Sequence, residues 1–359
     1  MTDSPPWEAT YVVVLAGGLG SRFWPVSRPE QPKQLLNLFG DGPMLRKTVE
    51  RLSSLVPFER QLIVTNVGIG DAVRAMLPEV PCENVLEEPV GRNTAPAIAW
   101  AASHVQHRHP GALLAVLPAD HHILPVDMFQ QDVGVALKAA LEGYLVTIGV
   151  PPTRPETGYG YIRVGEPLAP GIARALDFRE KPDVDTAMRY LAEGSYLWNG
   201  GMFFASVDVL VESLMRFEPA MMKAIAPLAD NPTAESICAI YSEIASISID
   251  YAVMERHDNV AVVPARFGWS DVGSWDAMHE LRAEEASSYR RGAVVEIEGA
   301  GNVLYAENGA IAAVGIEDMI VVHTPHATLV CPRDKAQLVR DAQRQIDALP
   351  DDRVPFNKG

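Results

Sequence analysis

The sequence predicts an α/β protein: a Rossmann-like domain with a mixed, mostly parallel sheet, followed by a small β unit with a terminal helix. Two observations predict this fold. Over the first half of the chain, short runs of Val, Ile and Leu alternate with segments of helical spacing, as is typical of parallel strands covered by helices on both faces. Beyond about residue 285, short apolar runs are separated by Gly, Asn and Asp turns. We therefore expect two domains, residues 1–284 and residues 285–359, the second resembling a few rungs of a β-helix.

The individual elements follow from these runs in chain order. Continuous apolar runs bounded by turn residues predict the first five strands, at residues 10–18, 60–66, 83–89, 111–120 and 143–150. The segments between them carry apolar residues at helical spacing, which predicts helices at residues 43–55, 70–77, 94–107 and 127–141. Further along, strands expected at residues 159–164, 173–182, 200–207 and 259–267 are interleaved with longer helices.

Composition argues against several classes of function. The 359 residues carry a net charge of −16, whereas sequence-independent binding to nucleic acid needs a basic surface. No apolar run approaches the roughly 20 residues that span a bilayer, and the N-terminus lacks a signal-peptide pattern, so we expect a cytoplasmic protein without membrane attachment. Cys82, Cys238 and Cys331 have no metal-binding spacing and are expected to be reduced, mostly buried thiols.

A glycine-rich turn follows the first predicted strand, at the position where open α/β sheets bind ligands. It contains Gly17, Gly18 and Gly20. A dinucleotide-binding fingerprint would need a third glycine where Phe23 stands, which argues against an NAD-binding oxidoreductase. A Walker loop would need Gly-Lys-Ser or Gly-Lys-Thr at the start of a helix, whereas Gly20 here precedes a Ser-Arg pair.

The residues after the turn favour an extended, positively charged loop. Pro25, Pro29 and Pro32 lack a backbone donor and oppose a regular helix over residues 21–34. The cations of this loop, which contains a single Glu, are Arg22, Arg28 and Lys33. Exposed glycine amides followed by Arg and Lys suit the triphosphate of a nucleotide. The alternative is a surface turn with scattered charges.

Seven segments of the chain, in order, resemble one enzyme family. They are GGLGSRFWPVSRPEQPKQ, EEPVGRNTAPAIAWAA, LPADHHI, TGYGYI, FREKP, WNGGMFF and FGWSDVGSW. Together they resemble the sugar-nucleotide pyrophosphorylases, specifically the mannose-1-phosphate guanylyltransferases, over nearly the whole chain. The resemblance implies a nucleotidyltransferase fold. It also implies transfer of GMP from GTP to α-D-mannose 1-phosphate, with GDP-mannose and pyrophosphate as products.

Two aspartates are candidate ligands of Mg²⁺, for which one or two protein carboxylates suffice. Asp120 ends a predicted strand and so lies at the ligand edge of the sheet, and Asp271 follows a late strand. The resemblance implies that they hold an ion that bridges the nucleotide α-phosphate and the sugar phosphate. The alternative for each is a turn or helix-capping carboxylate. His121 and His122 do not favour a transition-metal site, because adjacent side chains diverge.

The resemblance also implies a nucleobase site in the second of these segments. Glu88, Asn93 and Thr94 are candidates for guanine recognition, since a carboxylate can accept from guanine N1 and N2 while amides and hydroxyls can address O6. The other interpretation is that Asn93 or Thr94 caps the helix that follows. Leu15 and Ser21, on either side of the three glycines, complete the predicted nucleotide-binding set.

Three further motifs form the predicted sugar-phosphate site. Tyr159 follows Gly158 and precedes another glycine, in a turn that exposes an aromatic ring and bare backbone to a ligand. Glu180 suits two sugar hydroxyls, the adjacent Lys181 suits a phosphate, and Asn199 can donate to and accept from a hydroxyl. A Glu-Lys-Pro sequence alone would indicate a surface ion pair before a turn. The presence of all three motifs in the order found in the family favours a sugar-phosphate site instead.

The expected chemistry needs no side chain to activate the nucleophile, because a sugar phosphate with a second pKa of about 6 is largely ionised at neutral pH. We expect direct in-line displacement, with Arg22, Lys33 and Lys181 as catalytic cations. One alternative is a related pyrophosphorylase that uses another nucleoside triphosphate or hexose 1-phosphate, and another is an inactive nucleotide-sugar sensor. The strand-rich C-terminal unit is a candidate homodimer interface.

Overall fold

The structure is a computed structural model that describes residues 6–18, 20–230, 232–281 and 288–349. The chain forms two compact units. The first unit consists of Met1–Gly17, Arg46–Ala119 and Ile123–Trp269, and the second of Gly18–Leu45, Asp120–His122 and Ser270–Gly359. The predicted domain boundary between residues 284 and 285 lies outside the described residues.

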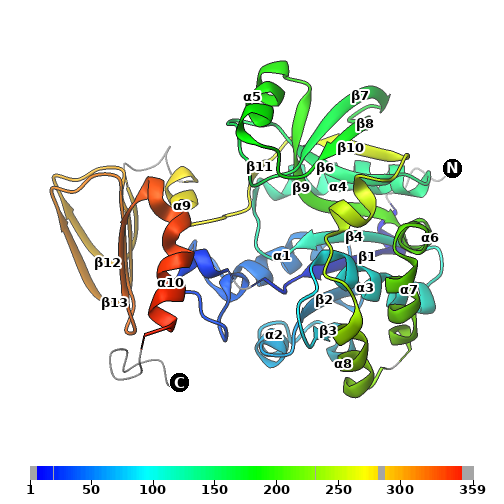
Figure 1. Ribbon diagram of the computed structural model, residues 1–359, viewed down its shortest axis with the longest axis horizontal. Coiled ribbons are helices and arrows are strands. Elements are labelled where there is room, and N and C mark those ends of the chain that lie inside the picture. Colours follow the sequence, from blue (N-terminus) through cyan, green and yellow to red (C-terminus); the bar gives the residue numbers. More distant parts are fainter. Residues whose placement is uncertain (1–5, 19, 231, 282–287, 350–359) are drawn as a thin grey trace. The chain divides into compact units, whose positions relative to one another are not determined.

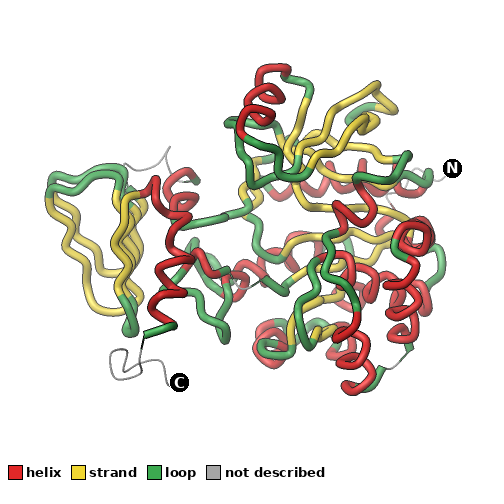
Figure 2. The backbone as a smooth tube through the Cα atoms, in the orientation of Figure 1, coloured by secondary structure: helices red, strands yellow, loops and turns green. Residues whose placement is uncertain are grey.

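A nine-stranded mixed sheet forms the centre of the first unit (Figures 1 and 2), in the order β3-β2-β1-β4-β9-β6-β10-β8-β7. Its strands are β1 (Thr10–Leu15), β2 (Gln61–Asn66), β3 (Val85–Glu88), β4 (Leu113–Pro118), β6 (Leu145–Val150), β7 (Tyr161–Ala169), β8 (Ile172–Arg179), β9 (Tyr196–Ser206) and β10 (Val260–Pro264). Strands β3, β2, β1 and β4 pair in parallel, and β9 runs antiparallel to β4 and β6. The mixed α/β sheet predicted from the sequence is thus confirmed.

The helices begin and end close to the predicted positions. They are α1 (Met44–Ser53), α2 (Gly70–Met76), α3 (Thr94–Arg108), α4 (Val126–Leu141), α5 (Val184–Glu193), α6 (Val207–Phe217), α7 (Pro219–Ile225), α8 (Ala234–Glu243), α9 (Asp276–Glu280) and α10 (Val339–Asp347). Side-chain caps fix several starts, because Asp183, Ser206 and Thr233 each accept a hydrogen bond from a main-chain N–H of the first turn. Helices α3, α6 and α7 pack together, with Trp100 and Leu214 in their shared apolar core.

Short helices of six residues or fewer and two short strands connect these elements. The helical turns are η1 (Pro6–Ala9), η2 (Ser21–Phe23), η3 (Lys33–Leu35), η4 (Phe58–Arg60), η5 (Cys82–Asn84), η6 (Ala226–Ala229), the π-helical η7 (Asp250–Met254) and η8 (Arg333–Leu338). The two short strands are β5 (His122–Leu124) and β11 (Gly268–Ser270). Residues 21–34 contain no α-helix, as the three prolines predict.

The second unit contains a four-stranded sheet in the order β12-β13-β14-β15. Its strands are β12 (Tyr289–Ile297), β13 (Val303–Val314), β14 (Met319–His323) and β15 (Thr328–Pro332). β12 pairs in parallel with β13, and β13 pairs in parallel with β14, with Tyr289 opposite Val303 and Val303 opposite Ile320. Parallel neighbours joined by a short turn are the rungs of a coil, so the predicted β-helix-like unit with a terminal helix is confirmed.

The prediction that the cysteines are mostly buried is wrong. All three are free, but Cys82 and Cys238 are exposed and Cys331 is half-buried. Cys82 lies in the single turn η5 before β3, and Cys238 lies on the short helix α8, whose buried residue is Tyr241. Among the described residues, no helix combines the length and the apolar character needed to cross a bilayer.

Candidate active site

The glycine turn after β1 closes tightly on the loop that follows it. Gly20 has φ +61°, and a Cβ at this position would lie 2.3 Å from the Cβ of Lys33, so only glycine fits. The Gly20 carbonyl accepts hydrogen bonds from Ser27 Oγ at 2.8 Å and from the Phe23 N–H at 3.0 Å. Phe23 is fully buried in the apolar core of the second unit. The residue that stands in place of a third fingerprint glycine therefore anchors the loop.

A polar cavity of about 460 Å³ lies beside this loop in the second unit. The predicted residues that line it are Gly20, Ser21, Arg22, Lys33, Asp120 and Asp271. They come from three segments far apart in the sequence: the loop after β1, the residues after β4, and the residues after β11. The structure thus brings together Arg22, Lys33 and both candidate metal ligands, whereas Arg28 of the same loop is not among the described residues that line the cavity.

Lys33 connects the two aspartates of this cavity. Its ammonium donates to Asp120 Oδ2 at 2.8 Å and to the main-chain oxygen of Asp271 at 2.5 Å. The Lys33 side chain is only 6% exposed, and its ammonium lies 5.9 Å from the centre of the Phe23 ring. A cation this buried must be paired to be tolerated, so its position is fixed by the groups that flank it.

The charge of Asp120 is maintained by its neighbours. Burial opposes ionisation of this carboxyl, but the positive charge of Lys33, with a contribution from His121, outweighs burial and lowers the pKa of Asp120. The side chain is therefore an anionic oxygen donor at neutral pH. This is the form that a hard cation requires.

The donor set of the cavity fits Mg²⁺ better than a transition metal. The described residues contain no group of three or more His, Cys, Asp or Glu side chains that could hold a metal ion. Mg²⁺ keeps several waters and needs only one or two carboxylates besides substrate phosphates, which Asp120 and Asp271 can supply. A Cβ at Gly273 would lie 3.1 Å from Asp271 Oδ2, so glycine leaves room for this carboxylate. The two histidines diverge as predicted: His121 lines the cavity, whereas the ring of His122 packs 4.4 Å from that of Phe39.

The cavity also contains a cation that the sequence did not indicate. Arg340 of α10 lines it, and Figure 1 shows α10 beside the loop that holds η2. The adjacent Val339 is 2% exposed and belongs to the same apolar core as Phe23 and Trp275, which fixes the helix against this loop. Neither Arg22 nor Arg340 has a hydrogen-bonding or ion-pair partner within the described part of the chain. Both guanidinium groups are therefore available to an anionic ligand.

Glu88, the candidate base-recognition residue, is buried at the end of β3 in the first unit. It is 4% exposed, its Oε1 has no hydrogen-bond partner among the described residues, and a Cβ at Gly17 would lie 3.4 Å from its Oε2. Burial raises the pKa of Glu88 to about 7, partly opposed by the hydroxyl of Tyr241. A buried acceptor without a partner is costly unless a ligand satisfies it, which is consistent with a binding role.

Other predicted nucleotide-binding residues have structural partners. Asn93, with φ +69°, accepts from the Thr94 N–H at 2.8 Å and caps α3, while Thr94 Oγ1 accepts from the Ile249 N–H at 2.9 Å. The capping interpretation is therefore correct for Asn93, and contact of either residue with guanine stays a prediction. The Leu15 carbonyl accepts from the Ala119 N–H at 3.1 Å, and a Cβ at Gly18 would meet no atom within 4 Å.

The sugar-side motifs meet in the first unit. The Tyr159 carbonyl accepts from the Lys181 N–H at 3.2 Å, and the next residue accepts from the Asn199 N–H at 2.8 Å. Lys181 Nζ lies 3.3 Å from Glu180 Oε1. Burial raises the pKa of Glu180 against the opposing charge of Lys181. The Gly158 N–H donates to a glutamate two residues earlier, at 2.9 Å, so this glycine shapes the turn.

Asp250 is a residue of this cluster that the sequence reasoning missed. Asn199 donates to Asp250 Oδ1 at 2.8 Å and accepts from Thr147 Oγ1 and the Gly201 N–H, each at 3.1 Å. Burial and the charge of Glu180 raise the pKa of Asp250 to about 6. Asn199 is therefore held in place with one amide hydrogen left for a ligand. The π-helical turn that begins at Asp250 is the kind of irregularity that marks functional positions, but it is visible only in the structure.

Most of the chain matches known proteins. The nucleotidyl transferase family matches residues 11–288, and the MannoseP isomerase/GMP-like beta-helix domain matches residues 292–345. The mannose-1-phosphate guanylyltransferase of Escherichia coli (strain K12) is 40% identical over 94% of this chain and 73% of its own length, and ManC of Salmonella typhimurium is also 40% identical with the same shares. A solved structure from Thermus thermophilus, described as a mannose-1-phosphate geranyltransferase, is 35% identical with a TM-score of 0.88 and covers 95% of this chain and 100% of that chain. The chain therefore belongs to the mannose-1-phosphate guanylyltransferases of the nucleotidyl transferase family.

Proposed function

We propose that this protein transfers GMP from GTP to α-D-mannose 1-phosphate and releases pyrophosphate. The observation that carries the proposal is the composition of the polar cavity. Two unpaired guanidinium groups, the buried Lys33 and a pair of aspartates line it together. In a chain of net charge −16, such a concentration of cations suits a ligand with several negative charges. The family membership of the chain supports GTP and mannose 1-phosphate as that ligand pair.

Each cation has a role that follows from its surroundings. Arg22 and Arg340 are unpaired in the described structure and would bind the outer phosphates, which become the leaving pyrophosphate. Lys33 is buried and preorganised, so it would stabilise charge that develops during the displacement without reorganising. The sugar phosphate is already ionised and attacks directly, so no covalent enzyme intermediate is needed.

Asp120 and Asp271 would hold Mg²⁺. The bound ion would supply Lewis-acid neutralisation of charge on the nucleotide α-phosphate and the sugar phosphate. Asp120 contributes an ionised carboxylate that Lys33 keeps oriented, and Asp271 is held through its main-chain oxygen by the same ammonium.

The sugar-side cluster would position mannose 1-phosphate. Glu180 and the remaining amide hydrogen of Asn199 would bond sugar hydroxyls, and the Lys181 ammonium would bind the phosphate. Asp250 would act through Asn199 as a positioning residue, because it fixes the orientation of the amide.

The proposal is tested by measuring pyrophosphate release across a matrix of nucleoside triphosphates and hexose 1-phosphates, with and without Mg²⁺. We expect the largest kcat/KM for GTP with mannose 1-phosphate, and loss of turnover without the ion. Preference for UTP or dTTP with glucose 1-phosphate would instead assign the protein to another pyrophosphorylase activity. Tight nucleotide binding without turnover for any pair would indicate a sensor.

Glu88 gives the proposed GTP site a defined pH dependence. Its pKa is raised to about 7, so the carboxylate that accepts from guanine N1–H and N2–H is lost as pH falls below 7. We expect the KM for GTP to decrease between about pH 6 and pH 8, and Glu88→Gln to raise it by about tenfold at pH 8. Steady-state kinetics over this pH series check both points. Any change caused by ionisation of GTP itself should appear equally in wild type and in Glu88→Gln. If the KM for GTP changed with pH to the same extent in both proteins, Glu88 would not be the base-recognition residue.

Arg340 should affect the pyrophosphate end of the reaction alone. In the reverse direction, Arg340→Ala should raise the KM for pyrophosphate by about tenfold, because one charge-assisted contact is lost, and should leave the KM for GDP-mannose unchanged. The matched control is Arg344→Ala on the same helix, since Arg344 is exposed and pairs with Asp341 at 3.4 Å. Equal KM values for pyrophosphate in the two variants would remove Arg340 from the site.

A further inference from the structure

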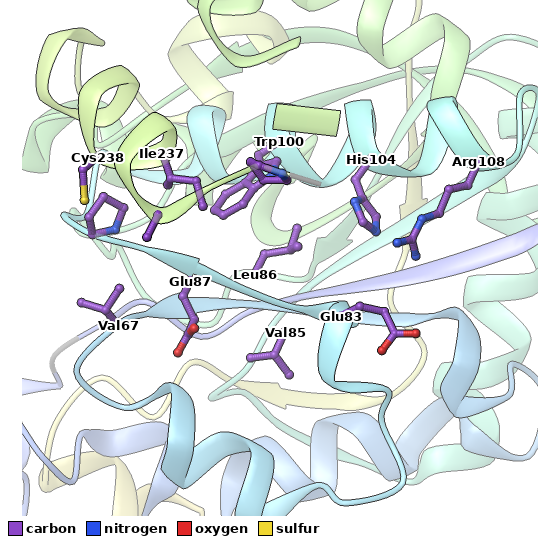
Figure 3. A pocket seen from close by; sticks show the side chains of 13 residues that line it. Val67, Glu83, Val85, Leu86, Glu87, Trp100, His104, Arg108, Ile237 and Cys238 are labelled. Atoms are coloured by element: carbon purple, nitrogen blue, oxygen red, sulfur yellow. The ribbon is translucent and has the colours of Figure 1, made fainter. Parts of the chain in front are cut away.

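A second cavity, of about 350 Å³, lies in the first unit between β3, α3 and α8 (Figure 3). Its walls are mostly apolar, with Val85 and Leu86 from β3, Trp100 from α3 and Ile237 from α8. None of the predicted site residues is among its described lining residues. Its volume falls near the lower end of the roughly 300–1,000 Å³ typical of small-molecule sites.

His104 is an unsatisfied polar group in the wall of this cavity. It is 7% exposed, and its Nε2 has no hydrogen-bond partner among the described residues. Figure 3 shows Trp100, His104 and Arg108, spaced by four residues along α3, pointing toward β3. Burial lowers the pKa of His104 to about 4, so the ring is neutral at physiological pH. A buried ring nitrogen without a partner favours a ligand that can hydrogen bond to it.

The open edge of the sheet supplies main-chain groups to the same cavity. β3 is the last strand on its side of the sheet, and the Glu88 carbonyl accepts from the Val67 N–H at 3.1 Å, toward β2. Because successive residues of a strand alternate in direction, the N–H and C=O of Glu87 face the open edge. The carboxylate of Glu87 is bonded to Arg74 at 2.7 Å, so it is engaged elsewhere. The apolar cavity is therefore bordered by one donor and one acceptor, the main-chain N–H and C=O of Glu87, and by the ring nitrogen of His104.

We propose that this cavity binds a small, planar, uncharged nitrogen heterocycle. Its ring edge would exchange hydrogen bonds with the Glu87 main chain and with His104 Nε2, and its faces would pack against Trp100 and Ile237. The strand β3 has only four residues, which is too short an edge for addition of a peptide strand. Glu83 and Arg108 line the cavity with opposite charges, which disfavours a strongly charged ligand of either sign.

The cavity is connected to Glu88 through packed rings. Trp100 contacts Tyr241 edge-on, with ring centres 5.8 Å apart, and the Tyr241 hydroxyl is close enough to Glu88 to oppose the rise of its pKa. Tyr241 lies one turn beyond Ile237 and Cys238 on α8, the helix that forms one wall of the cavity. Occupancy would therefore change the KM for GTP. This second part rests on the proposed role of Glu88 in base recognition.

Quinazolin-4-one is a suitable probe, because it is planar, uncharged and carries an adjacent N–H donor and C=O acceptor. Titration calorimetry or ligand-observed NMR with the full-length protein should show saturable binding. The N3-methyl derivative, which lacks the donor, should bind at least about tenfold more weakly. Absence of saturable binding by the probe, or equal binding by the two compounds, would overturn the proposed hydrogen-bonded site.

Protein variants locate the bound probe. Cys238→Trp fills the mouth of the cavity from α8 and should abolish binding, whereas Ala239→Trp adds the same bulk at the next, exposed position and should leave it unchanged. His104→Phe keeps an aromatic ring but removes the nitrogen and should weaken binding by about tenfold. Thermal unfolding verifies that each variant is folded. Retained binding in Cys238→Trp would show that the probe lies elsewhere and would overturn the assignment.

The coupling to Glu88 has its own measurement. Saturating probe should shift the KM for GTP by at least about twofold in wild type and Ala239→Trp, and should have no effect in Cys238→Trp. An unchanged KM in wild type with probe bound would overturn the coupling. Since binding is measured without turnover, failure of the proposed transferase activity would leave the binding result intact and is thereby distinguished from failure of this site.

Discussion

Asp120→Asn should lower kcat for GDP-mannose formation by about 10²–10³-fold, the cost of removing one preorganised electrostatic contact from a comparable site. Asparagine has nearly the same size as aspartate and retains an oxygen that can accept from Lys33, but it has no charge. The substitution therefore isolates the anionic oxygen that the ion requires. Pyrophosphate release measured over a series of Mg²⁺ concentrations should show a reduced maximum and a higher concentration of the ion at half-maximal rate.

The control for this variant is Asp341→Asn, which neutralises an exposed carboxylate on α10 that pairs only with Arg344 among the ion pairs of the described residues. It should retain wild-type kinetics, because exposed ion pairs contribute little. An Asp120→Asn protein with wild-type kcat and Mg²⁺ dependence would rule out Asp120 as a metal ligand.

Lys33→Ala is expected to have an effect of similar size, about 10²–10³-fold in kcat. The change removes a buried cation from beside the proposed position of the reacting phosphates. It also removes the group that lowers the pKa of Asp120, so burial would act on that carboxyl with less opposition. Steady-state kinetics in the forward direction measure the loss, and Lys33→Met, which keeps an apolar stem in the cavity, should show the same loss if charge is the cause.

A double-mutant cycle tests whether Lys33 and Asp120 act as one unit. The 2.8 Å contact between them predicts that Lys33→Ala combined with Asp120→Asn loses much less activity than the product of the two single losses. Losses that multiply fully would indicate that the two side chains contribute independently, despite their contact.

Local sequence patterns sufficed to predict the sheet and most of the residues that line the polar cavity beside the glycine turn. Runs such as Thr10–Leu15 are buried at every position but the last, so their apolar character identifies them as strands without reference to the rest of the chain. Strand ends in a parallel sheet converge on one edge, which is why the position of Asp120 at the cavity could be predicted from its place after an apolar run. The loop over residues 21–34 followed from its prolines, whose effect on the backbone is local.

The residues that were missed depend on tertiary packing. Arg340 and Arg344 lie one turn apart on an amphipathic helix, and only the docking of Val339 into the apolar core decides which of them reaches the cavity. Asp250 joins the sugar-side cluster through Asn199, 51 positions earlier in the chain. Nothing in the sequence of the short helix α8 indicates that Tyr241 is buried or that it lies close to Glu88. Side chains recruited over such separations leave no periodic pattern for sequence reasoning to detect.

The docking of α10 against the loop after β1 limits how the C-terminal unit of this chain can be exchanged for another. In a chimaera that joins the first 288 residues of this chain to a foreign tail, Arg22 would be the one unpaired guanidinium that this chain itself contributes to the described cavity. If Arg340 binds phosphate as proposed, such a hybrid would need a basic residue at the matching position of the incoming tail. Exchange of this tail would therefore have to keep a positive charge on the terminal helix as well as the packing of that helix.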